Sequence, residues 1–150
     1  YSYNALNEAL EKYAKGRVFS DIGCYTLGAL EPFDAINTCV DMGASITMAK
    51  GASDAGLHPS VAVIGDSTFT HSGMTGLLDA VVEQTPVTVI ISDNSTTGMT
   101  GGQQSHATNR LEETPTRQAA HWPSRRRTLA KPGLRICAGR LPDGDRREPA

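Results

Sequence analysis

Apolar residues recur at two different spacings along this chain, and the two spacings predict two kinds of element. Val61–Ile64 is a short, continuous apolar run with β-branched residues, which is typical of a strand buried on both faces of a parallel sheet, and Val87–Ile91 predicts a second buried strand. Between them, apolar residues recur at steps of three and four, which predicts a helix that begins near Ser72 and ends before Thr85-Pro86. The apolar positions of this helix are Met74, Leu77, Leu78, Val81 and Val82. Strand, helix and strand form a βαβ unit, whose right-handed crossover brings both strand ends to one edge of the sheet.

The region before this unit contributes further predicted elements. Tyr3, Leu6, Leu10 and Tyr13 form the stripe of an amphipathic helix that stops at Gly16. We also expect a strand over residues 17–22, a loop over 23–28 and a helix over 43–56. Together with the βαβ unit, these elements predict an α/β fold in which helices flank a parallel sheet.

Composition changes sharply near residue 114 and divides the chain into two regions. Residues 1–114 hold 5 Lys/Arg and 13 Asp/Glu, a net charge of −8, whereas residues 115–150 hold 9 Lys/Arg and 3 Asp/Glu, a net charge of +6. The second region is rich in Arg, Pro and Gly and has no apolar periodicity, which is typical of a segment without a stable fold. We therefore expect a domain over residues 1–114 and an irregular, disordered tail with few strand pairings over 115–150. A shifted reading frame in a GC-rich gene would produce such a tail, a hypothesis that the coding DNA tests.

Several classes of protein are disfavoured by what the sequence lacks. It has no run of about 18 apolar residues and no signal peptide, so we expect no membrane span and a cytoplasmic location. The three cysteines are odd in number and widely spaced, so they form neither a disulfide framework nor a metal motif. Neither the P-loop motif nor GxGxxG occurs, which argues against the common nucleotide-binding folds. The run Arg125–Arg127 invites nucleic-acid binding, but no nucleic-acid module accompanies it.

Two polar residues stand at predicted strand ends and indicate a shared site. Asp66 follows the first buried strand and Asn94 follows the second. Because ligands bind beyond the carboxyl ends of strands in open parallel sheets, we expect these two side chains to lie close together. A carboxylate and an amide oxygen suit Mg²⁺, and neighbouring small residues such as Gly65 and Ser67 let backbone N–H groups approach an anion. Asp and Asn are also ordinary turn residues, so a purely structural role is the alternative.

Four sequence motifs carry a resemblance to a known family. Gly65-Asp66-Ser67, followed after 26 residues by Asn94, resembles the motif of enzymes that bind thiamine diphosphate. In that motif the third position is usually glycine and the closing pair is often Asn-Asn, so Ser67 and Asp93 depart from it. The motifs are DIGCYTLG (21–28), MGASI (42–46), GDSTFTHSG (65–73) and DNSTTGMTGG (93–102). They resemble the 2-oxoacid:ferredoxin oxidoreductases, in particular the large subunit of the indolepyruvate branch, over residues 16–104, and imply a truncated domain of the fold that binds the cofactor's diphosphate.

The resemblance implies a role for each matching residue. Asp66 and Asn94 would supply side-chain oxygens to Mg²⁺ and Thr96 its backbone carbonyl, with two diphosphate oxygens and a water completing six ligands. The residues implied to line the diphosphate and thiazolium are Gly43, Ala44, Ser45, Gly65 and Ser67. Cys24 and Tyr25 would lie at the mouth of the site, and His71 would act as an acid–base group or a substrate contact. The alternative for Cys24 is a small buried hydrophobe, and for His71 a residue that covers the following helix.

The implied activity is the oxidative decarboxylation of a 2-oxoacid, such as indolepyruvate or another aryl pyruvate, to an acyl-CoA. Thiamine diphosphate and Mg²⁺ would be the cofactors and ferredoxin the electron acceptor, with 4Fe-4S clusters expected only in regions absent from this chain. The implied partners are a pyrimidine-side domain that supplies the activating glutamate, the small subunit of the same enzyme, coenzyme A and the 2-oxoacid. Two alternatives stay open: another thiamine diphosphate-dependent decarboxylase or synthase, and a non-catalytic fragment.

Overall fold

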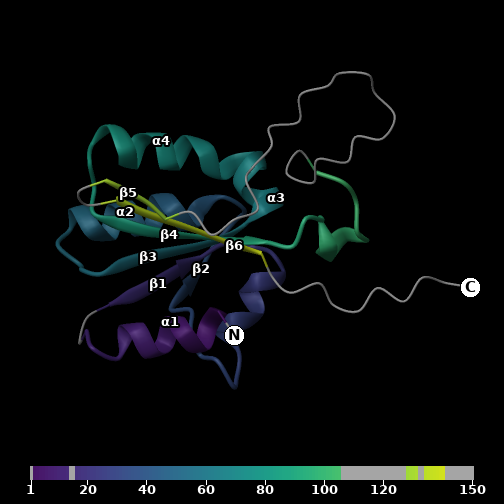
Figure 1. Cartoon of the computed structure of the whole chain (residues 1–150), viewed down its shortest axis with the longest axis horizontal. Helices are drawn as coiled ribbons and strands as arrows, with labels where there is room; N and C mark the ends of the chain where they lie inside the picture. The colour runs from purple at the N-terminus through teal and green to yellow at the C-terminus, as the bar shows by residue number, and fades with distance from the viewer. Residues whose placement is uncertain (1, 14–15, 106–127, 132–133, 141–150) are drawn as a thin grey trace, which may run out of the picture.

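The computed structural model describes residues 2–13, 16–105, 128–131 and 134–140 of the 150-residue chain. At its centre is a six-stranded sheet in the strand order β2-β1-β3-β4-β6-β5 (Figure 1). The strands are β1 (Arg17–Ser20), β2 (Thr38–Cys39), β3 (Ser60–Gly65), β4 (Val87–Asp93), β5 (Thr128–Lys131) and β6 (Leu134–Arg140). Neighbouring strands run parallel, except that β5 and β6 pair antiparallel.

Helical segments connect the strands. They are α1 (Ser2–Leu10), the 3₁₀ helix η1 (Cys24–Ala29), α2 (Ala44–Asp54), α3 (Asp66–Thr68), the π-helical η2 (Phe69–Gly73), α4 (Met74–Val82) and the 3₁₀ helix η3 (Gly98–Thr100). None of the helices in the described part of the chain is long and apolar enough to cross a membrane.

Two layers of helices enclose the sheet, with α2 and α4 on one face and α1 on the other (Figure 1). Successive residues of β3 alternate between these layers, because strand side chains point to opposite faces in turn. Ala62 and Ile64 belong to the apolar cluster that includes residues of α2 and α4, whereas Val61 and Val63 belong to the cluster that includes Leu6 of α1. All six residues of β3 are buried, so the prediction of a strand covered on both faces is confirmed.

The predicted elements before the βαβ unit are largely confirmed. The helix expected over 43–56 is α2, and Ile46 within it is fully buried. The first helix exists but ends at Leu10, so including Tyr13 in its buried stripe was wrong, because that side chain is 57% exposed. The prediction of a loop over residues 23–28 is wrong, because the 3₁₀ helix η1 occupies most of that range. Thr26 stabilises the start of η1: its hydroxyl accepts from the Gly23 N–H at 2.9 Å and donates to the Asp21 carbonyl at 2.6 Å.

The helix of the βαβ unit begins earlier than its sequence indicates. The prediction that Ser72 starts it is wrong, because the chain becomes helical at Asp66, directly after β3, and passes through the π-helical turn η2 into α4. The Ser72 hydroxyl instead donates to the Met42 carbonyl at 3.1 Å. The cap-like serine therefore connects η2 to the loop before α2.

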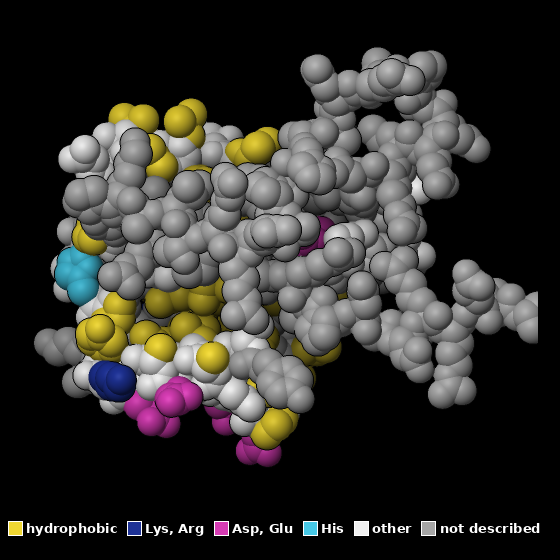
Figure 2. Space-filling model, viewed as in Figure 1, with side chains coloured by type: hydrophobic (Ala, Val, Ile, Leu, Met, Phe, Trp, Pro, Cys, Tyr) yellow, Lys and Arg dark blue, Asp and Glu magenta, His cyan; other side chains and the backbone are white. Residues whose placement is uncertain are grey.

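The predicted buried face of α4 is also partly wrong. Met74, Leu78 and Val82 are 55%, 64% and 71% exposed, while Gly76 and Ala80 face the protein. Figure 2 accordingly shows hydrophobic side chains along the side of the molecule where α4 lies in Figure 1. Small residues face inward because α4 lies close to α2: a Cβ atom on Gly76 would come within 2.9 Å of a Thr47 methyl carbon. An apolar helix has no single polar face, so its periodicity does not reveal which side is buried.

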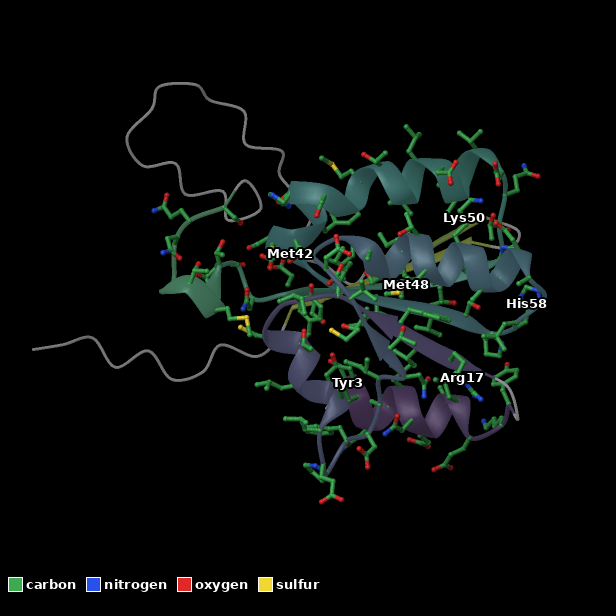
Figure 3. All side chains as sticks on the ribbon, turned by 180° about the vertical axis from the view of Figure 1, so that it is seen from behind. Tyr3, Arg17, Met42, Met48, Lys50 and His58 are labelled. Atoms are coloured by element: carbon green, nitrogen blue, oxygen red, sulfur yellow. The ribbon has the colours of Figure 1, made fainter. Side chains whose placement is uncertain are left out.

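One lysine links the same two helices. The Lys50 ammonium group of α2 lies 2.8 Å from the Asp54 carboxylate, 3.6 Å from that of Asp79 and 2.5 Å from that of Glu83. Asp79 belongs to α4 and Glu83 directly follows it, so the ion pairs join the helices on the solvent side (Figure 3).

The expectation of a tail with few strand pairings is wrong for two segments. β6 pairs with β4 in parallel from Thr88↔Arg135 to Asp93↔Arg140, and β5 pairs with β6. Without β6, β4 would be an edge strand with a row of unpaired backbone N–H and C=O groups. A segment of almost any composition can pair with these groups, because the hydrogen bonds are made by the backbone. The remaining tail residues, 115–127, 132–133 and 141–150, lie outside the described residues, so their disorder, the boundary at residue 114 and the shifted reading frame stay predictions.

Candidate functional site at the carboxyl edge of the sheet

Three neighbouring strands bring acidic and amide side chains to the same edge. Asp21 follows β1, Asp66 follows β3, and Asn94 follows β4, which ends at Asp93. These strands are adjacent and parallel, with Gly65 of β3 in register with Ser92 of β4. The prediction that Asp66 and Asn94 follow neighbouring parallel strands is therefore confirmed.

Asp66 is a buried carboxylate without enough hydrogen-bond donors. It is only 7% exposed, and its Oδ2 atom has no hydrogen-bond partner among the described residues. Burial, with a smaller contribution from the negative charge of the neighbouring Asp93, raises the pKa of Asp66 to about 6 against the opposing effect of the Ser67 N–H. An unpaired buried carboxylate oxygen destabilises a protein unless a cation or donor reaches it. The Asp66 carboxylate is thus suited to bind a cation.

The loop after β4 is held by its own side chains. The Asp93 carboxylate accepts hydrogen bonds from the Ser95 N–H at 2.8 Å and the Ser95 hydroxyl at 3.1 Å. The Asn94 side-chain oxygen accepts from the Thr96 N–H at 3.2 Å. These Asx-type turns fix the loop beside Asp66, and the Asn94 amide oxygen retains a second lone pair for a ligand.

Two contacts connect this loop to the other segments named in the sequence analysis. The Thr97 hydroxyl donates to the Ser67 hydroxyl at 3.1 Å, which joins the loop to the start of α3. A Cβ atom on Gly98 would lie 3.4 Å from the Cys24 sulfur and 3.6 Å from the Asn94 amide nitrogen, so Cys24 borders the loop. Cys24 is exposed, which excludes the alternative of a buried hydrophobe.

The start of α2 is joined to this edge by Asp21, a residue that was not predicted from the sequence. The Asp21 carboxylate accepts from the Gly43 N–H at 2.9 Å, from the Ser45 hydroxyl at 3.0 Å and from the Tyr25 hydroxyl. The Ala44 N–H is also used internally, donating to the Asp41 carbonyl at 3.2 Å. A strand expected to continue to residue 22 concealed Asp21 inside it, whereas β1 ends at Ser20 and makes Asp21 a strand-end residue like Asp66.

His71 lies at the side of this arrangement. It is exposed, and its Nδ1 atom lies 3.0 Å from the hydroxyl oxygen of Ser72. Ser72 packs against Gly43, where a Cβ atom would come within 2.3 Å of its hydroxyl oxygen. Ser72 therefore lies between His71 and the residue that precedes α2. The acid–base role of His71 stays a prediction.

Clusters of three or more His, Cys, Asp or Glu side chains able to hold a metal are absent from the described residues. A site built only from protein side chains, such as a structural zinc site, is thus excluded for this part of the chain. A Mg²⁺ ion that takes most of its ligands from a phosphate and water needs only one or two carboxylates, and the edge at Asp66 provides them.

The raised pKa of Asp66 predicts how the stability of the cofactor-free domain depends on pH. The folded-state pKa, about 6, lies above the ordinary aspartate value of 3.8, so the folded state binds the proton more tightly than the unfolded state. The free energy of unfolding should therefore fall as pH rises from about 4 to about 6, by roughly 1.4 kcal/mol per unit of pKa difference at most. Urea denaturation at pH 4.5 and pH 7 measures this change for the wild type and for Asp66→Asn.

Asp21, whose pKa is also raised by burial, is present in both proteins, so the difference between them isolates Asp66. The Asp66→Asn protein should gain stability relative to the wild type at pH 7 and much less at pH 4.5. An equal difference at both pH values would contradict the prediction.

The chain matches a family model and several known proteins. The family model described as "Thiamine pyrophosphate enzyme, C-terminal TPP binding domain" matches residues 21–133. The chain is 39% identical over 102 residues to the indolepyruvate oxidoreductase subunit IorA of Archaeoglobus fulgidus, covering 68% of this chain and 16% of that subunit. It is 46% identical over 84 residues to the IorA subunit of Methanothermobacter marburgensis, covering 56% of this chain and 14% of that subunit.

A solved structure supports the fold. The 2-oxoglutarate:ferredoxin oxidoreductase of Magnetococcus marinus, solved with 2-oxoglutarate, coenzyme A and succinyl-CoA bound, matches 69% of this chain and 37% of its own chain, with a TM-score of 0.57 and 22% identity. The resemblance to the indolepyruvate branch of the 2-oxoacid:ferredoxin oxidoreductases is confirmed by the similarity to the IorA subunits. The chain spans about one sixth of the length of the IorA subunits that it matches. With its parallel sheet, its buried acidic edge and a family match over residues 21–133, this chain belongs to the C-terminal TPP-binding domain family of thiamine pyrophosphate enzymes.

Proposed function

We propose that this chain binds the diphosphate end of thiamine diphosphate through Mg²⁺ at the edge formed by Asp66 and the loop after β4. The observation that carries the proposal is the buried Asp66 Oδ2 atom, which has no donor among the described residues. A divalent cation would satisfy this oxygen and relieve the repulsion between the Asp66 and Asp93 carboxylates. The lack of any wholly protein-built metal cluster in the described chain agrees with an ion that also needs the diphosphate.

The proposed ion would be held by the Asp66 carboxylate, the Asn94 amide oxygen and the Thr96 backbone carbonyl. Ser67, held by Thr97, and Gly65, which has no side chain, would line the diphosphate. The start of α2 (Gly43, Ala44 and Ser45) would form part of the wall around the diphosphate. The Gly43 and Ala44 N–H groups would not donate to it, because they already have partners within the protein. This refines the role that the resemblance implies for the helix start.

The full enzyme of which this domain would be part is proposed to decarboxylate 2-oxoacids oxidatively, with aryl pyruvates such as indolepyruvate as substrates. Bound thiamine diphosphate supplies a carbon nucleophile for the keto carbon of the substrate. The residues of this chain would bind and orient that group. Coenzyme A would take the acyl group, and ferredoxin would take the electrons through 4Fe-4S clusters in other parts of the enzyme.

The activating glutamate is proposed to come from a pyrimidine-side domain. Glu83, one of the described glutamates, pairs with Lys50 between α2 and α4, away from Met42 and the carboxyl end of the sheet (Figure 3). A partner domain or subunit would therefore complete the site. The alternative of another thiamine diphosphate-dependent decarboxylase or synthase is separated by testing whether the full enzyme reduces ferredoxin.

Isothermal titration calorimetry of this chain with thiamine diphosphate tests the proposal. We expect binding in the presence of Mg²⁺ and its loss when EDTA removes the ion, because the diphosphate and Asp66 repel each other without a cation between them. Thiamine without its diphosphate serves as the matched control and should show no Mg²⁺-dependent binding. Equal affinity for thiamine diphosphate with and without Mg²⁺ would contradict the proposal.

A further inference from the structure

The Asp21 carboxylate is the most completely buried acidic group at the carboxyl edge, with 0% of the residue exposed. Both of its oxygens are in use. Oδ2 accepts from the Gly43 N–H at 2.9 Å and the Ser45 hydroxyl at 3.0 Å, and Oδ1 accepts from the Tyr25 hydroxyl. A charged group with several donors at this depth forms strong hydrogen bonds, and removing it leaves those donors unsatisfied.

The first consequence concerns the start of α2. Gly43 is the residue that precedes this helix, and it has no side chain with which to cap the helix's free N–H groups. Asp21, 22 positions earlier in the sequence, accepts hydrogen bonds from the Gly43 N–H and from the Ser45 hydroxyl of the first turn, and its negative charge suits the positive end of the helix dipole. Gly43 has a left-handed φ of 92°, a conformation that glycine favours. The hydrogen bond from its N–H to Asp21 holds this backbone turn in place.

The second consequence concerns the residue before Asp66. The Tyr25 ring lies against Gly65: a Cβ atom there would come within 2.5 Å of a carbon of that ring. The Tyr25 hydroxyl is held by Asp21, so Asp21 fixes the ring that packs on the end of β3. One buried carboxylate thereby connects η1, the start of α2 and the Gly65-Asp66 turn.

We propose that Asp21 is a positioning residue for the cofactor site, acting through Gly43 and Tyr25 on the loops that would surround the diphosphate. Asp21 is too deeply buried to touch the cofactor, and it acts by fixing groups that lie nearer. This inference rests on the proposed function.

The test compares the cofactor affinity of four proteins: the wild type, Asp21→Ala, Asp21→Asn and Ser60→Ala. Asp21→Ala should raise the Kd for thiamine diphosphate, measured by calorimetry with Mg²⁺, by roughly 10–100-fold, as removal of groups that orient metal ligands typically does. Asp21→Asn keeps an oxygen acceptor for the Gly43 N–H and should recover most of the affinity. Hydrogen exchange of the Gly43 amide, followed by NMR, should be fast in Asp21→Ala and slow in Asp21→Asn.

Ser60→Ala is the matched control. Ser60 is 1% exposed, and its hydroxyl donates to the Leu57 carbonyl at 2.7 Å at the opposite end of β3, so its loss costs a buried hydrogen bond far from the site. It should lower stability and leave the Kd unchanged. If Asp21→Ala does not fold, Tyr25→Phe replaces it, because it removes only the hydroxyl that Asp21 holds, and it too should raise the Kd.

The outcomes separate the two proposals. Wild-type affinity in folded Asp21→Ala, or in Tyr25→Phe where the alanine variant does not fold, would overturn the positioning role and leave the proposed function in place. A change in Ser60→Ala as large as that in Asp21→Ala would also overturn it, because general destabilisation would then explain both. A wild-type chain that does not bind thiamine diphosphate with Mg²⁺ would reject the proposed function and the role of Asp21 with it.

Discussion

Replacing Asp66 with asparagine should weaken the Mg²⁺-dependent affinity for thiamine diphosphate by at least about 100-fold. Loss of a group that merely orients a metal ligand typically costs 10–100-fold, and Asp66 would be a direct ligand and the only charged one. Asparagine is nearly isosteric, and it removes a buried charge whose pKa burial raises to about 6, so the domain should fold at least as stably at pH 7. Calorimetry gives the affinity and urea denaturation the stability of the same samples.

Asp79→Asn is the matched control for this substitution. It makes the same chemical change on α4, where the Asp79 side chain is 56% exposed and lies 3.6 Å from the Lys50 ammonium group. Its affinity for the cofactor should equal that of the wild type. Undiminished affinity in Asp66→Asn would reject Asp66 as a metal ligand, whereas reduced affinity combined with unimpaired stability would separate loss of the site from loss of the fold.

Replacing Ile64 with alanine should lower the free energy of unfolding by roughly 2–5 kcal/mol. Ile64 of β3 is fully buried on the face of the sheet that α2 and α4 cover. Its Cδ1 atom would lie 2.7 Å from a Cβ atom on Gly73. The sheet and the helices cannot collapse fully around the cavity, so the loss includes a cavity contribution as well as the lost apolar burial. Because domains of this kind are stable by only about 5–15 kcal/mol, the change should be prominent in urea denaturation.

Val82→Ala provides the comparison. It also removes apolar carbon atoms, but from a side chain of α4 that is 71% exposed, and should change the free energy of unfolding by no more than about 0.5 kcal/mol. Equal losses for the two substitutions would show that the exposed and buried layers have been assigned wrongly.

The amino-acid sequence alone was sufficient to predict the strands of the βαβ unit and the edge at which Asp66 and Asn94 lie. β3 and β4 could be predicted because each contains a run of mostly apolar, β-branched residues that is typical of a strand inside a parallel sheet. Parallel pairing then follows from the length of the connection, and the placement of Asp66 and Asn94 follows from parallel pairing. Each step depends on local pattern and chain connectivity, which a sequence contains.

The helices show where local pattern is insufficient. α4 carries apolar residues on both its buried and its exposed sides, so packing against α2 decided that Gly76 and Ala80 face inward and Leu78 outward. The helical start at Asp66 was hidden for a similar reason, because Ser72 has the residue type of a cap but its hydroxyl contacts the Met42 carbonyl of another loop.

Tertiary structure also decided two features that no local pattern contains. The pairing of β6 with β4 satisfies the backbone of β4, and backbone hydrogen bonds do not depend on the side chains that make the tail look irregular. The surroundings of Asp21 were set only when folding brought Gly43, Ser45 and Tyr25 around its carboxylate. The sequence by itself determined that β3 and β4 form and that their polar ends gather at one edge. Which groups surround a buried charge was decided by the folded structure, because hydrogen bonds between distant segments depend on three-dimensional proximity that sequence spacing does not encode.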